Sequence, residues 1–230
     1  MLVVLNNKCH FEKENFKKYL KELNRISTIN ELVLCPSNIY LNGIKLKRIF
    51  LGSQNVSKNS NGAYTGEISA KQLKSINVDY CIVGHSERRA NNNETNKDIN
   101  LKIKQLLKHN ITPILCIGET KNERTNNETE IILKKEINEA LKDIDKKEKV
   151  IIAYEPLWSI GTNEVLSPEE IEKVILSIRN IVPNNRILYG GSVTEENIEK
   201  FNEVNLLDGY LLGKVSLYPQ RVKKLLEKLV

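Results

Sequence analysis

The sequence is poor in aromatic side chains and has no long hydrophobic run. Phe, Trp and Tyr make up 6% of its 230 residues, and one residue is tryptophan. No apolar stretch approaches the roughly 20 residues of a membrane-spanning helix, so we expect no membrane partner. The first residues, MLVVLNNK, have neither a basic lead nor an extended apolar segment, and we expect no signal peptide.

Cysteine is also scarce, and its four copies form no metal or redox motif. Cys9, Cys35, Cys81 and Cys116 are far apart in the sequence and include no C-x-x-C pair, which argues against zinc or a redox dithiol. Three of them lie in or beside apolar runs, where a free cysteine behaves as a small hydrophobic residue. The pattern favours reduced thiols in a cytoplasmic chain.

Positive charge is in excess but is not concentrated anywhere. The formal net charge is +6, and the basic residues alternate with acidic ones, as in residues 130–147. No basic stripe with interleaved aromatics is present, so solvated helix faces explain the charge better than nucleic-acid binding. We expect no nucleic-acid partner, whereas attraction of a small anion is compatible with the charge.

Short apolar runs recur along the whole chain. They are residues 2–5, 32–35, 49–52, 80–83, 112–117, 150–154, 186–189 and 209–212. Several lack alternation, which is typical of strands buried on both faces. Most are followed by an amphipathic segment, and Ser167, Pro168 and Glu170 form a helix-start signal. The pattern predicts an α/β fold, a (β/α)8 TIM barrel in which residues 1–230 form a single domain. A doubly wound dinucleotide-binding sheet fits less well, because no glycine-rich turn follows the first run.

Polar residues and glycines follow these runs, where a barrel carries its active site. They include Asn6, Lys8, His85, Glu87, Glu155, Gly190, Ser192, Gly213 and Lys214. Moving a carbonyl along a sugar needs a carboxylate base and a donor that stabilises an enediolate oxygen. The glycine-bearing turns after the seventh and eighth runs can present backbone N–H groups to a phosphate.

Six motifs stand in order across nearly the whole chain. They are GAYTGEIS (62–69), VGHSERR (83–89), LCIGE (115–119), AYEPLWSIGT (153–162), YGGSV (189–193) and DGYL (208–211). Together they resemble the landmarks of the triosephosphate isomerase family. The resemblance implies reversible interconversion of dihydroxyacetone phosphate and D-glyceraldehyde 3-phosphate, a step of glycolysis and gluconeogenesis. It implies no metal and no organic cofactor.

The same resemblance assigns roles to the residues of the predicted rim. Glu155 is implied to be the base that moves the proton, and neutral His85 the hydrogen-bond donor to the carbonyl oxygen. Lys8 would supply positive charge to the phosphate and the enediolate, and Asn6 would hold Lys8 and a substrate oxygen. Glu87 would be the partner of Lys8.

The resemblance also implies a phosphate site, a lid and a dimer. The backbone N–H groups of Gly161, Ser192, Gly213 and Lys214 would bind the phosphate, under a lid formed by residues 156–166. A homodimer is expected, with an ion pair between Glu67 and Arg88 across the interface and Thr65 reaching the partner's active site.

The sequence departs from the family pattern at four positions. Asn7 stands where an aromatic residue is common, and Asn163 and Glu164 replace a Gly-Lys pair at the far end of the lid. Lys214 replaces a glycine, and a backbone conformation that needs glycine would be strained there.

Two alternative functions remain open at this point. One is a barrel enzyme acting on a different sugar phosphate, which would need other groups at Glu155 and His85. The other is a binding protein without activity, which the loss of a catalytic residue or strongly salt-dependent nucleic-acid binding would support.

Overall fold

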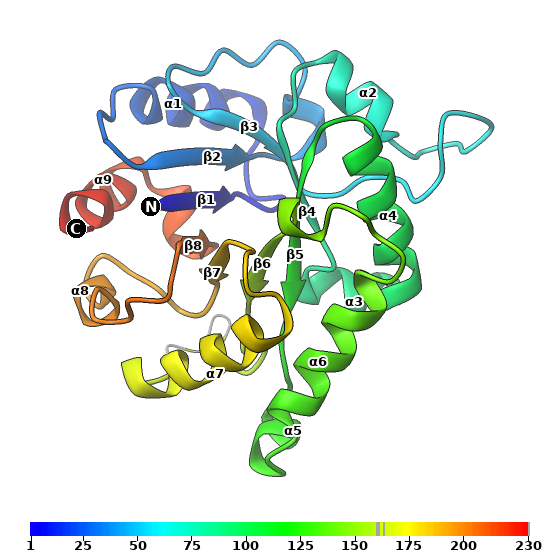
Figure 1. The fold of residues 1–230 in the computed structure, drawn as a ribbon. Coiled ribbons are helices and arrows are strands. Elements are labelled where there is room, and N and C mark those ends of the chain that lie inside the picture. The colour runs from blue at the N-terminus through cyan, green and yellow to red at the C-terminus, as the bar shows by residue number, and fades with distance from the viewer. Residues whose placement is uncertain (160–161, 163, 230) are drawn as a thin grey trace.

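The computed structural model describes residues 1–159, 162 and 164–229. In these residues eight parallel strands are joined in chain order, and β8 pairs with β1 to close the sheet. Helices surround the barrel (Figure 1). The predicted α/β fold, a (β/α)8 TIM barrel, is confirmed.

The strands lie where the apolar runs predict them, with ends that differ by at most one residue. They are β1 (Leu2–Asn6), β2 (Glu31–Cys35), β3 (Phe50–Ser53), β4 (Tyr80–Val83), β5 (Thr112–Ile117), β6 (Ile151–Tyr154), β7 (Ile187–Tyr189) and β8 (Gly209–Leu212). The α-helices are α1 (Lys13–Leu23), α2 (Ala70–Ser75), α3 (Ser86–Asn92), α4 (Asn96–Lys108), α5 (Lys121–Thr125), α6 (Thr129–Ala140), α7 (Pro168–Ile181), α8 (Ile198–Phe201) and α9 (Pro219–Lys228). Short 3-10 helices are η1 (Asn38–Tyr40), η2 (Lys147–Lys149) and η3 (Lys214–Leu217).

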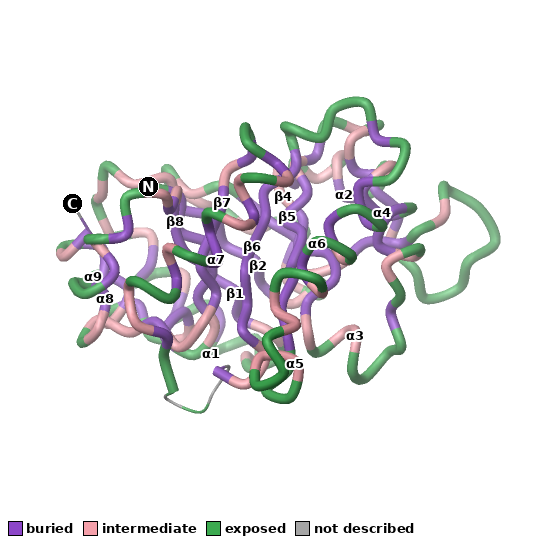
Figure 2. Tube along the Cα trace, turned by 60° about the horizontal axis from the view of Figure 1, so that its bottom comes forward, coloured by how far each residue is buried: buried purple, intermediate pink, exposed green. Residues whose placement is uncertain are grey.

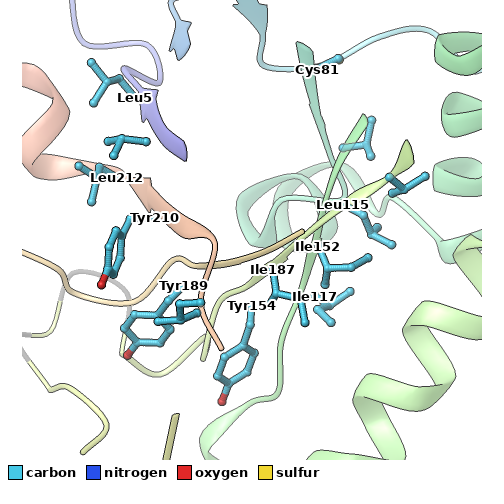
Figure 3. Packing of buried hydrophobic residues seen from close by; sticks show 14 of the residues in the cluster. Leu5, Cys81, Leu115, Ile117, Ile152, Tyr154, Ile187, Tyr189, Tyr210 and Leu212 are labelled. Atoms are coloured by element: carbon cyan, nitrogen blue, oxygen red, sulfur yellow. The ribbon is translucent and has the colours of Figure 1, made fainter. Parts of the chain in front are cut away.

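Alternation along each strand divides the side chains into an inner and an outer set. The inner set, which includes Val4, Ala153 and Leu211, forms a cluster of strand residues inside the barrel. The outer set packs against the helices and includes Tyr154 and Tyr189 (Figure 3). Apart from the first residues of β2, β3, β4 and β5, both sets are buried, and the strands are mostly purple in Figure 2, which explains why several runs are apolar without alternation.

The start of α7 has the predicted geometry. The Ser167 side chain accepts from the Glu170 N–H, the Glu170 side chain accepts from the Ser167 N–H, and Pro168 occupies the first turn. This capping box satisfies two backbone donors that the helix itself leaves without partners, and it fixes where the chain leaves the segment that follows β6.

Candidate active site

At the ends of four strands, the residue that keeps the inward-facing alternation lies at one mouth of the barrel. Asn6 ends β1, Glu155 follows β6, Gly190 follows β7 and Gly213 follows β8, each in step with the inner set. These four residues line a cavity of about 190 Å³, together with His85. The period of two therefore brings an amide, a carboxylate and two glycine-bearing turns to a common space, which the imidazole of His85 also lines.

Glu155 and His85 face each other in this cavity. Glu155 Oε1 lies 3.4 Å from His85 Nε2, and both side chains are buried. The other oxygen, Glu155 Oε2, is buried and has no hydrogen-bond partner among the described residues. A buried carboxylate oxygen without a protein partner is available to take a proton from a molecule in the cavity.

The backbone at the end of β4 holds His85 in place. Gly84 has φ +70°, and a Cβ there would lie 2.8 Å from Ile99 Cδ1, so a side chain is excluded for two reasons. Its N–H donates to Glu94 Oε1 at 3.2 Å, and its carbonyl accepts from Arg89 Nε at 2.7 Å. Both polar groups of the residue before His85 are thus fixed by side chains.

The hydrogen bonds of His85 determine which ring nitrogen carries the proton. His85 Nδ1 accepts from the backbone N–H of Glu87 at 3.3 Å, at the start of α3. A nitrogen that accepts a hydrogen bond carries no proton, so the neutral ring has its N–H at Nε2, the atom that faces the cavity. A donor is therefore presented beside the carboxylate of Glu155.

Lys8 enters the same cavity in a constrained conformation. Its φ of +51° is unusual for a residue with a side chain, and its N–H donates to Asn6 Oδ1 at 3.1 Å. Lys8 Nζ lies 2.5 Å from Glu87 Oε1. Partial burial raises the pKa of Glu87, but the hydrogen bond and charge of Lys8 outweigh it, so the net pKa of Glu87 is lowered. The lowered pKa favours the charged form of the Glu87 carboxylate that Lys8 Nζ contacts beside the cavity.

An ionic cluster around the buried Glu94 lies beside the backbone that holds His85. Glu94 Oε2 accepts from Arg88 Nε at 2.6 Å and from Lys102 Nζ at 2.7 Å, and Lys102 Nζ also donates to Asn55 Oδ1. Burial raises the pKa of Glu94, yet the two cations lower it further than burial raises it. Sequence analysis missed Glu94, Lys102 and Arg89, because no local pattern marks a charged residue in a polar stretch as buried.

The predicted phosphate turn lines the same cavity, with Gly213 close to the Lys8 side chain: a Cβ at Gly213 would lie 3.8 Å from Lys8 Nζ. Ser192, Gly213 and Lys214 line the cavity, whereas Gly161 lies outside the described residues. The Ser192 N–H donates to Ser159 Oγ at 3.3 Å, so a phosphate would have to replace that contact. Lys214 begins η3 and does not have a positive φ, so the backbone strain considered for this position is absent.

The segment after Glu155 is anchored by charged and aromatic contacts. Trp158 Nε1 donates to the buried Glu119 Oε1 at 3.2 Å, and Lys121 Nζ lies 4.1 Å from the Trp158 ring centroid. Lys121 Nζ also lies 3.0 Å from Glu164 Oε2, so the acidic residue that departs from the family pattern has a basic partner. The other departure at this point, Asn163, lies outside the described residues.

The residues expected at a dimer interface lie on the loop between β3 and α2 and on α3. Thr65 and Glu67 are exposed on the loop between β3 and α2, which extends away from the barrel as a cyan trace in Figure 1. Arg88 is half-buried and engages Glu94 through Nε within the same chain.

Two further observations bear on the possible chemistry. Within the described part of the chain, no group of three or more His, Cys, Asp or Glu side chains is placed to hold a metal ion. None of the helices in that part is both long and apolar enough to cross a membrane.

A carboxylate beside a neutral imidazole, at the mouth of a parallel barrel, defines the class: a barrel enzyme that moves protons by acid–base chemistry. A family model described as triosephosphate isomerase matches residues 1–229. The chain is 42% identical over 221 residues to the triosephosphate isomerase of Mycoplasmopsis agalactiae, covering 94% of this chain and 85% of that protein. It is 42% identical over 224 residues to that of Dictyoglomus thermophilum, covering 91% and 90%. It is 37% identical over 233 residues to that of Clostridium perfringens, covering 94% of each. The chain belongs to the triosephosphate isomerase family.

Proposed function

We propose that this isomerase interconverts dihydroxyacetone phosphate and D-glyceraldehyde 3-phosphate, with Glu155 as the base. The approach of Glu155 Oε1 to His85 Nε2, at 3.4 Å inside the cavity, carries the proposal. Glu155 removes a proton from the carbon beside the carbonyl and returns it to the neighbouring carbon. His85 donates its Nε2–H to the carbonyl oxygen, which stabilises the enediolate as charge develops there, and then takes the proton of the neighbouring hydroxyl, so that a proton also moves between the two oxygens.

The remaining predicted site residues act on charge and on position. Lys8 places an ammonium group at the cavity, where Glu87 Oε1 accepts from Nζ, while Asn6 Oδ1 accepts from the Lys8 backbone N–H and holds the main chain. The backbone N–H groups of Ser192, Gly213 and Lys214 bind the phosphate. Gly161 contributes to the same site as part of a lid that is formed by residues 156–166. Burial of the base supports this arrangement, because exclusion of water strengthens each of these electrostatic contacts.

We also propose that residues 1–230 work as one catalytic domain in a cytoplasmic homodimer. The loop that carries Thr65 and Glu67 supports the dimer, because it extends away from the barrel and leaves both side chains exposed and accessible to a partner. In that assembly Glu67 pairs with the partner's Arg88, and Thr65 approaches the partner's cavity. Sedimentation of the native protein tests the dimer directly.

The activity is tested by comparing the native protein with Glu155→Gln. Glutamine keeps the shape of the side chain but cannot take the proton, so we expect kcat to fall by at least about 100-fold. Glu196→Gln is the matched control, because Glu196 lines the same cavity with an exposed carboxylate and should leave kcat unchanged. A native protein without activity on triose phosphates, but active on another sugar phosphate, would contradict the substrate assignment.

A further inference from the structure

Asn7 occupies a buried polar position directly behind the catalytic rim. It follows Asn6 at the end of β1, and alternation turns its side chain away from the cavity, toward α1 and η3. The residue is 1% exposed. Asn7 Nδ2 lies 3.2 Å from Tyr19 Oη, 3.2 Å from the Ser216 carbonyl oxygen and 3.3 Å from Ser216 Oγ.

The orientation of the Asn7 amide follows from these neighbours. The Ser216 carbonyl can only accept, so the group that faces it must be the NH2 group. Asn7 Oδ1 then points to a place where it has no partner among the described residues. A buried acceptor without a partner lowers the free energy of unfolding, so the contribution to stability does not by itself explain an amide at this position.

The contacts of Asn7 lie where the backbone ladder of the barrel ends. Register between β1 and β8 runs from Leu2 opposite Gly209 to Leu5 opposite Leu212 and goes no further. Beyond that pair, the segments that follow β1 and β8 are joined by side-chain hydrogen bonds. Asn7 donates to Ser216, and Ser216 Oγ donates to the Asn6 carbonyl at 3.0 Å.

These bonds connect the two halves of the proposed site. On one side, Asn6 and Asn7 immediately precede Lys8, whose ammonium group lies at the cavity. On the other side, the Ser216 N–H donates to the Gly213 carbonyl at 2.9 Å, which closes the turn that starts η3. The distance between the ammonium group and the phosphate turn therefore depends on the link between Asn7 and Ser216.

We propose that Asn7 is a positioning residue that sets the Lys8 ammonium group against the Gly213–Lys214 turn through its hydrogen bonds to Ser216. The proposal rests on the function proposed above, because it assumes that this turn receives the phosphate. Asn7 itself does not contact the cavity, so its effect on substrate is exerted through Lys8 and Ser216.

The test compares Asn7→Leu with Asn185→Leu. Asn185 is a matched control because it is also a buried asparagine, 3% exposed, that donates to two carbonyls, those of Lys147 and Val150. It lies before β7, at the opposite mouth of the barrel from the site. Each variant removes one amide and leaves backbone acceptors without donors, so both should unfold at a lower temperature than the native protein.

Binding of inorganic phosphate, measured by calorimetry, separates the two variants. We expect the Kd for phosphate and the KM for glyceraldehyde 3-phosphate to rise about tenfold in Asn7→Leu and to stay unchanged in Asn185→Leu. Ser216→Ala removes one of the acceptors and should show part of the loss, and it serves as the second variant if Asn7→Leu does not fold.

Phosphate binding by Asn7→Leu within twofold of the native value would overturn the proposal, as would an equal loss in Asn185→Leu. The outcome is independent of the assigned reaction. If the native protein lacks triose-phosphate activity while phosphate binding still depends on Asn7, the positioning role stands and the substrate assignment fails.

Discussion

Gly190 lies against the side chain of the proposed base, and Gly190→Ala would place a methyl group there. A Cβ at this position would lie 2.7 Å from Glu155 Cγ and 3.3 Å from Glu155 Oε1. Carbon atoms in contact are normally about 3.5–4.0 Å apart, so the Glu155 side chain must move by about 1 Å. The obstructing atoms belong to a side chain rather than to the backbone, so the base yields before the barrel does.

The magnitude follows from that displacement. A shift of about 1 Å in a reacting group can lower a rate about 100-fold, because the geometry of attack is lost. We therefore expect kcat to fall roughly 100-fold, which corresponds to about 2.7 kcal/mol in the activation free energy. An overpacked core typically loses about 1–3 kcal/mol of unfolding free energy, and we expect Gly190→Ala to lose less than that.

Two measurements test this prediction: the rate of conversion of glyceraldehyde 3-phosphate, and the free energy of unfolding in urea. Gly52→Ala is the control, since a Cβ at Gly52 would lie 2.4 Å from the buried Cys35 Sγ and would crowd the barrel wall without touching Glu155. That variant should lose stability and keep kcat. Inorganic phosphate should bind Gly190→Ala as it binds the native protein. A kcat for Gly190→Ala within threefold of native would refute the reasoning.

Three further predictions concern charges around the site. Glu94→Gln leaves the buried Lys102 and the half-buried Arg88 without their carboxylate and should cost about 3–5 kcal/mol of unfolding free energy, measured with urea. The hydrogen bond from Lys58 lowers the pKa of Asp98 from 3.8 to about 2, so its contribution is complete above pH 3.8 and is lost as the pH falls through about 2. Asp98→Asn should therefore destabilise the protein by up to about 1 kcal/mol at pH 7 and not at pH 2, and an equal loss at both would contradict this. Lys121→Ala should change the emission of Trp158, the sole tryptophan, and alter the free energy of unfolding by less than about 1 kcal/mol.

The barrel could be predicted from the sequence because its signals are local. Each strand is a short apolar run, and the run at 80–83 has the bounds of β4. The cap at Ser167 needs three residues, and they are neighbours in the chain. Polar groups that follow these runs must gather at one mouth once the strands are parallel, so Glu155 and His85 could be placed together in advance.

The supports of the site could not be predicted in the same way. Glu94 stands in an asparagine-rich stretch that reads as a polar loop, and its burial depends on Lys102 and on Asn55 from another loop. The position of Asn7 was notable only as a departure from the family pattern. Its contacts with Ser216 depend on β1 and β8 lying side by side, which is a property of the closed sheet and not of either segment.

The pairing of β1 with β8 has a consequence for how the protein is made. The ribosome delivers β1 first and β8 last, so both β1 and β7 have an unpaired edge until residues 209–212 have emerged. An open sheet with two free edges is prone to associate with other chains, and a barrel cannot close around a missing strand. A chain cut short before Gly209 should therefore accumulate as an intermediate that associates with other chains, and not as a smaller enzyme, because the barrel closes only when the ladders of β8 with β7 and β1 have formed.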